Sequence, residues 1–118
     1  MAHRYKFYAA ETGTAYQYFF AHSRSVNRPE GQGAGNDYVF VVTADQRPPF
    51  MLRVFVSERA LEAWRQAEGR DLDSSGIYAV AKMRLFRAFD EIEALRDEAL
   101  NLLVDEGNIM ELLAPLDL

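Results

Sequence analysis

The alternation of apolar and polar residues changes its period once, near the middle of the chain. From Phe50 to Val56 apolar residues fall on alternate positions, which is the period of a β-strand. From Ser57 onward Leu61 and Trp64 recur at helical spacing, and the Ser57 hydroxyl can cap the first helical turn. We therefore expect a strand that leads directly into a helix ending near Gly69, with a shared buried contact of Val54, Leu61 and Trp64.

Aromatic residues at alternate positions predict further strands before this point. The pattern marks strands at Arg4–Ala10, Thr14–His22 and Tyr38–Ala44. Gly13, between the first two, can take the positive φ of a tight turn, which predicts a hairpin.

The stretch Ser23–Asp37 has the composition of a loop. It contains three glycines and a proline, and Val26 is its main apolar residue. Such a segment has little to bury, so we expect a mobile loop in which a protease cuts first near Arg24 or Arg28.

The second half of the chain predicts a long helix and an apolar tail. Ser74 or Ser75 can cap a helix that runs to about Asp105, although its charges oppose the helix dipole and favour either local ion pairs or a bend near Asp90. The tail Asn108–Leu118 is too apolar to remain in solvent, so we expect a docked short helix or strand. The predicted fold is α+β, one domain over residues 1–118: a four-stranded antiparallel meander followed by two helices on one face.

Four short runs stand out in roughly the last two-thirds of the chain. They begin at Arg53 (Arg-Val-Phe-Val-Ser-Glu-Arg-Ala-Leu), Ala88 (Ala-Phe-Asp-Glu-Ile-Glu-Ala-Leu) and Gly107 (Gly-Asn-Ile-Met), and the chain closes with Pro-Leu-Asp-Leu. These runs resemble a family of short bacterial domains of uncharacterised activity. The resemblance implies a hairpin, a Ser-x-x-Ala-Leu helix, a longer helix and a terminal strand over Asn108 to Leu113. It carries no catalytic or binding residue to this chain.

Charge and cysteine content narrow the classes of function. The net charge is −5, and the basic excess lies in residues 1–53, which hold six basic and four acidic residues. An acidic chain argues against an obligate nucleic-acid binder. The absence of cysteine fits a reducing cytoplasm, and the sequence has no apolar run that predicts a signal peptide or a membrane span, so we expect a cytoplasmic protein.

Candidate catalytic and metal sites are few. His3 and His22 would meet at the open end of the first hairpin, where a two-histidine metal site is conceivable. No further ligand falls at a recognisable spacing, so we favour two exposed strand-end histidines. The glycines of residues 31–35 precede a strand and do not open a helix, unlike a phosphate loop. We expect no cofactor and no enzymatic activity.

The aromatic strands give the sequence its leading functional hypothesis. Two helices cover only one face of a four-stranded sheet, and apolar residues remain that are assigned to the other face. We therefore expect a non-catalytic interaction or regulatory module that forms a homodimer, with room for an unknown protein partner. The alternative is that the apolar tail Asn108–Leu118 crosses to this face and closes it within one chain. The predicted interface residues are Tyr8, Phe19, Met51 and Phe55.

A second hypothesis uses the same sheet as a ligand platform. Aromatic rings beside Arg4, Lys6 and Arg53 could stack a small molecule or the bases of a single-stranded nucleic acid. Size-exclusion mass and the ultraviolet absorbance ratio of the purified protein separate the two hypotheses.

Overall fold

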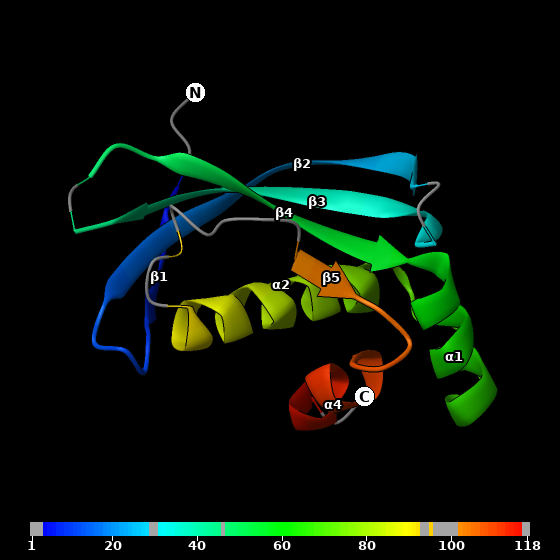
Figure 1. Cartoon of the computed structure of the whole chain (residues 1–118). Coiled ribbons are helices and arrows are strands. Elements are labelled where there is room, and N and C mark those ends of the chain that lie inside the picture. The colour runs from blue at the N-terminus through cyan, green and yellow to red at the C-terminus, as the bar shows by residue number, and fades with distance from the viewer. Residues whose placement is uncertain (1–3, 29–30, 46, 93–94, 96–101, 117–118) are drawn as a thin grey trace.

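The fold is α+β, with one curled mixed sheet and helices packed on it (Figure 1). The computed structural model describes residues 4–28, 31–45, 47–92, 95 and 102–116. The predicted class is therefore confirmed, while the numbers of strands and helices differ from the prediction.

The sheet has five strands in the order of the sequence. The first four form the predicted antiparallel meander, and the fifth pairs in parallel with the fourth. The strands are β1 (Lys6–Ala9), β2 (Ala15–Arg28), β3 (Gly33–Ala44), β4 (Phe50–Ser57) and β5 (Leu102–Val104).

The helices lie on one side of this sheet (Figure 1). Helix α2 runs along the sheet, α1 continues from the end of β4, and α4 packs beside α2 and is followed by a single 3-10 turn. Their bounds are α1 Glu58–Glu68, α2 Ser74–Glu91, α4 Ile109–Leu113 and η1 Ala114–Leu116.

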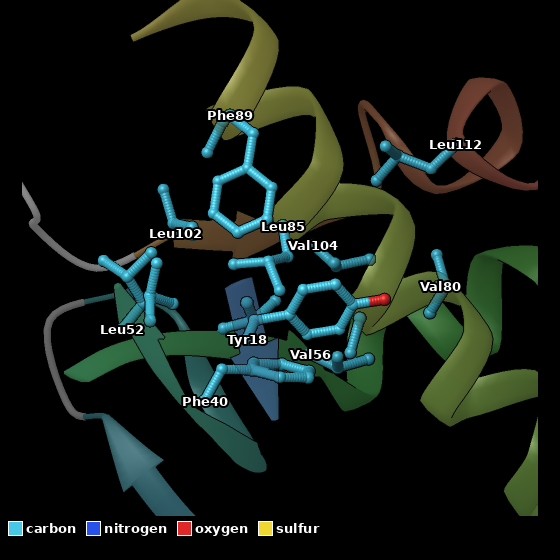
Figure 2. Packing of buried hydrophobic residues seen from close by; sticks show 14 of the residues in the cluster. Tyr18, Phe40, Leu52, Val56, Val80, Leu85, Phe89, Leu102, Val104 and Leu112 are labelled. Carbon is cyan, nitrogen blue, oxygen red and sulfur yellow. The ribbon is translucent and has the colours of Figure 1, made fainter. Parts of the chain in front are cut away.

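The hydrophobic core fills the space between the sheet and α2. Aromatic rings from β2 pack on the helix, and the Tyr16 ring stacks on Phe89 with centroids 4.2 Å apart. Smaller side chains of β4 and β5 complete the layer, which lies opposite Val80 and Leu85 of α2 (Figure 2). The sheet side chains in this layer include Tyr18, Phe40, Leu52, Val56, Leu102 and Val104.

The junction between β4 and α1 is the one that the sequence predicts. The Ser57 hydroxyl accepts a hydrogen bond from the Ala60 N–H at 3.0 Å, and Gly69 ends α1 in the left-handed conformation. Val54 and Trp64 are buried in one cluster, and Leu61 packs against it while remaining half-buried.

The predicted loop at Ser23–Asp37 is wrong. Strand β2 continues to Arg28, and β3 begins at Gly33, so most of this stretch is paired as a hairpin. Its polar composition concealed the strands because the contacts that hold them are an ion pair and a close backbone approach, not an apolar stripe. The expected early cleavage at Arg24 or Arg28 loses its basis, since both residues lie in β2.

The predicted second helix is too long. Helix α2 is capped by Asp73, whose carboxylate accepts from the Gly76 N–H at 2.8 Å, and it ends at Glu91, close to the bend considered at Asp90. Residues 102–104 form β5, where the pattern had predicted helix, and residues 93–94 and 96–101 lie outside the described part of the chain. The opposed charges of the longer helix were therefore a sign of two elements.

The apolar tail docks, as expected, and it does so as a helix. Ile109, Leu112 and Leu113 of α4 are buried in the common core. The terminal strand over residues 108–113 that the family resemblance implied is therefore wrong for this chain, and the strand of this region comes earlier, at β5.

Trp64 allows a direct test of how α1 docks. Its side chain is 4% exposed, and its indole N–H meets no acceptor among the described residues. We expect Trp64→Ala to lower the free energy of unfolding by about 3 kcal/mol or more, through lost burial and a cavity. Trp64→Phe keeps most of the ring volume and removes the unpaired N–H, so it should cost much less. Urea unfolding measures both variants, and a loss below about 1 kcal/mol for alanine would show that α1 does not depend on this contact.

Candidate interaction surfaces

The sheet face opposite α2 carries a row of apolar side chains that no described helix covers. Phe19, Val41 and Met51 lie directly opposite one another on β2, β3 and β4. The Tyr5 ring packs edge-on against Phe19, with centroids 4.9 Å apart, and Phe7 lies beside them on β1. Phe7 is 73% exposed and Met51 66% exposed. We call this side of the sheet the uncovered face; such an apolar row on a surface is typical of an interaction site.

Farther along the same face, a buried carboxylate organises the long β2–β3 hairpin. Asp37 is 2% exposed, and its carboxylate accepts from the Arg28 guanidinium at 2.7 Å, with Arg24 at 4.0 Å. A buried carboxylate is costly unless it is paired, so Asp37 needs these partners to remain in place. The pair ties the two strands together at the point where the sequence predicts a loop.

The Arg28 guanidinium also covers Phe55. It lies 4.5 Å from the centre of the Phe55 ring, which is 1% exposed. The ring fits because the neighbouring strand has a glycine there: a Cβ on Gly35 would meet the Phe55 Cζ atom at 2.7 Å and would also press on the Val56 carbonyl oxygen. Phe55 faces away from α2 as predicted, but it is buried within the chain and is not accessible at an interface.

The predicted interface residues divide into separate environments. Phe19 and Met51 belong to the uncovered face, and Phe55 is buried beside it. The prediction that Tyr8 shares this face is wrong, because its ring stacks on Phe86 of α2 with centroids 4.5 Å apart. The strand has the expected alternation, and Tyr8 belongs to its inward side.

The structure does not bring the residues of the predicted ligand face together. Lys6 pairs with Tyr18, whose side chain packs on α2, so Lys6 lies on the helix side of the sheet, while Arg53 is exposed on the uncovered face. Arg4 is exposed just before β1.

Of the two histidines considered for a metal site, His22 is exposed on β2 after a bulge, and His3 lies outside the described residues.

A groove lies at the end of β1, between this strand, α2, α4 and η1. Its volume is about 470 Å³, and its apolar lining comes from Met83, Phe86, Leu112 and Pro115. We call it the β1 groove. Its charged lining consists of Glu11, Arg87, Asp90, Glu91 and Glu111, and is therefore acidic in sum.

Two hydrogen bonds fix β1 to α2 at the rim of this groove. The Tyr8 hydroxyl donates to the Asp90 carboxylate at 2.7 Å, and the Glu11 backbone N–H donates to the other oxygen of that carboxylate at 2.9 Å. Across the groove, Arg87 pairs with Glu111 of α4 at 2.8 Å. Sequence reasoning missed this site because it joins residues far apart in the chain.

A second cavity, of about 430 Å³, lies where the parallel strands β4 and β5 end. Phe55 and Leu103 form part of its lining, and the Arg59 guanidinium donates to the Gly31 carbonyl at 2.9 Å beside it. Asp105, also in the lining, accepts the backbone N–H groups of Gly107 and Asn108 and so closes the turn into α4. The polar groups that line this cavity are therefore already engaged in hydrogen bonds that hold the surrounding loops together.

The described residues offer neither a metal-binding cluster nor a membrane-spanning helix. Among them there is no cluster of three or more histidine, aspartate or glutamate side chains that could hold a metal ion. None of their helices has both the length and the apolar character needed to cross a membrane.

Comparison of the chain with protein-family models, with curated proteins and with solved structures finds no match in any of the three. The surfaces described above are therefore the basis on which a function can be argued.

The Asp37 ion pair can be tested by a change of one atom. Asp37→Asn keeps the shape of the side chain and removes the charge that faces Arg28, so we expect the free energy of unfolding to fall by about 1–3 kcal/mol. The exposed residue Asp45 provides the matched control: Asp45→Asn should stay within about 0.5 kcal/mol. Equal effects in urea unfolding would contradict a stabilising role for the pair.

The Tyr8–Asp90 hydrogen bond predicts a loss of stability at alkaline pH. Burial, then the hydrogen bond to Asp90 and its charge, raise the pKa of Tyr8 from 10.0 to about 12. Because the folded protein holds this proton more tightly than the unfolded chain, the contribution is complete below pH 10 and is lost as the pH rises toward 12. Tyr8→Phe should thus be less stable than the wild type at pH 9, and the difference should shrink between pH 10 and 12. A constant difference across urea titrations at these pH values would refute the assignment.

Proposed function

We propose that this protein is a non-catalytic interaction module of the cytoplasm and that it self-associates. The observation that carries the proposal is the apolar row of the uncovered face, with Phe7 and Met51 mostly exposed at its two ends. Apolar area of this kind on a sheet is stabilised by contact with another protein surface, and a second copy is the commonest partner of a small domain.

Several features of the chain support an interaction role over a catalytic one. Two hollows of the described surface are lined in part by side chains engaged in ion pairs and turns, as at Arg87 and Asp105. The absence of cysteine supports the cytoplasmic location.

Self-association is tested by sedimentation equilibrium from low to high micromolar concentration. We expect the mass to rise from 13.5 kDa toward twice that value. Phe7→Glu places a charge at the most exposed large apolar side chain of the described residues and should raise the dissociation constant at least about tenfold, an increase that corresponds to about 1.4 kcal/mol.

The control is an exposed apolar residue elsewhere. Met110 of α4 is 41% exposed, and Met110→Glu should leave the dissociation constant unchanged. A wild-type protein that stays at 13.5 kDa at high micromolar concentration would refute the proposal.

A second candidate function has one observation in its favour. Arg24 and Arg53 are exposed on the uncovered face, near the aromatic row, which gives this face the mixed aromatic and basic character of surfaces that stack bases. The test is the ratio of absorbance at 260 nm to that at 280 nm in the purified protein. A raised ratio, on the order of that of nucleic-acid complexes, would show a co-purifying nucleotide and favour this ligand-binding role.

A further inference from the structure

Strand β1 leaves one edge of the sheet open. Residues of an antiparallel strand alternate between those bonded to the partner and those that point away from it. The Ala10 N–H bonds to the Thr14 carbonyl at 2.9 Å, so Tyr8, two residues earlier in the same ladder, is also bonded to β2. The N–H and C=O groups of Phe7 and Ala9 therefore point outward, and within the described residues no hydrogen bond reaches them.

The opposite edge of the sheet is closed. The Leu103 carbonyl on β5 accepts from the Arg84 guanidinium at 3.0 Å and from the Asn108 side-chain amide at 2.9 Å. Side chains thus occupy the position that another strand would need. On the β1 side of the sheet, the part of β2 beyond Tyr18, which β1 does not reach, is also unpaired among the described strands, and β1 is the part of this edge that lies beside the β1 groove.

The surroundings of β1 are oppositely charged at its two ends. Lys6 lies at the start of the strand, close enough to Lys82 of α2 to help burial lower the pKa of Lys82. Glu11 and Asp90 lie at the other end, where the β1 groove adds Glu91. A two-fold axis across the middle of β1 would bring the basic end of one copy to the acidic end of the other.

We propose that two copies of this chain pair through their β1 strands, antiparallel and with the two-fold axis at Tyr8, to form one continuous sheet. This register sets Phe7 opposite Ala9 of the second copy, and the outward groups of both residues in both copies then find partners. Lys6 approaches the acidic end of the second copy's β1 groove. The inference rests on the self-association proposed above but places it at the edge of the sheet, so the apolar row beyond Phe7 stays open to a further protein partner.

The charge arrangement explains why this edge can pair at all. Short edge strands that carry lysine are usually protected from pairing, because the lysine charge is stranded when another strand approaches. Here the approaching copy supplies carboxylates for Lys6, so pairing is favoured for this partner and opposed for others. The uncovered faces of the two copies then join into one wider surface, on which Met51, far from the seam on β4, remains free.

The test uses two charge reversals and their mixture, measured by sedimentation at equal total concentration. Lys6→Glu and Glu11→Lys should each weaken self-association at least about tenfold, because each sets like charges together. Mixed in equal amounts, they should associate with near wild-type strength, since both contacts of the mixed dimer join a glutamate to a lysine. The Asp90 contact is retained in Glu11→Lys, because it uses the backbone N–H of residue 11.

Met51→Glu separates this inference from the broader proposal. It should leave the dissociation constant unchanged if the copies meet at β1. If the dimer persists in both charge-reversal variants but is lost in Met51→Glu, the β1 inference is overturned and the broader proposal of self-association stands. A wild-type monomer at high micromolar concentration would overturn both.

Hydrogen exchange of the wild type provides a measurement that needs no variant. The amides of Phe7 and Ala9 should become protected as concentration rises, while the exposed amides of residues 70–71, between α1 and α2, serve as reference. Exchange at these two amides that does not depend on concentration, in a sample shown to be dimeric, would overturn the inference.

Discussion

The end of strand β4, at residues 54–56, is covered on both faces, and the rest of the structure depends on this. Val54 and Val56 face α2, and Phe55, between them in sequence, is enclosed on the other side by Arg28 and the backbone of Gly35. The strand also pairs with an antiparallel neighbour on one side and a parallel one on the other, and it leads directly into α1. Helix, hairpin and C-terminal strand are all positioned by this one segment.

The sequence predicted the elements whose contacts are apolar and close in the chain. The junction at Ser57 and the hairpin at Gly13 follow from local spacing and turn chemistry, and both are present. The extended β2–β3 hairpin could not be predicted in this way, because Asp37 and Arg28 read as loop residues until their pairing is known. Strand β5 was hidden because its three residues are too few to show a period.

The candidate surfaces were predictable in part for the same reason. Alternation correctly assigned Phe19 and Met51 to the face away from α2, but it could not tell that Phe55 is covered by Arg28, nor that Tyr8 belongs with Phe86. The β1 groove is built from residues of four elements, so no local pattern pointed to it. Exposure and edge position, which distinguish the surfaces available for binding, are properties of the assembled chain.

The parallel pairing of β5 with β4 has a consequence for how the chain reaches this structure. The meander β1–β4 is made of contacts between neighbours in sequence, so the entropy of loop closure is small at each step. Leu102 meets Val54 only after α1 and α2 have been placed between them. During synthesis, the growing chain can therefore complete four strands while β4 still has an unpaired side, and its final partner emerges from the ribosome only after α1 and α2. For that interval β4 is itself an edge strand, and it becomes an interior strand only when β5 arrives.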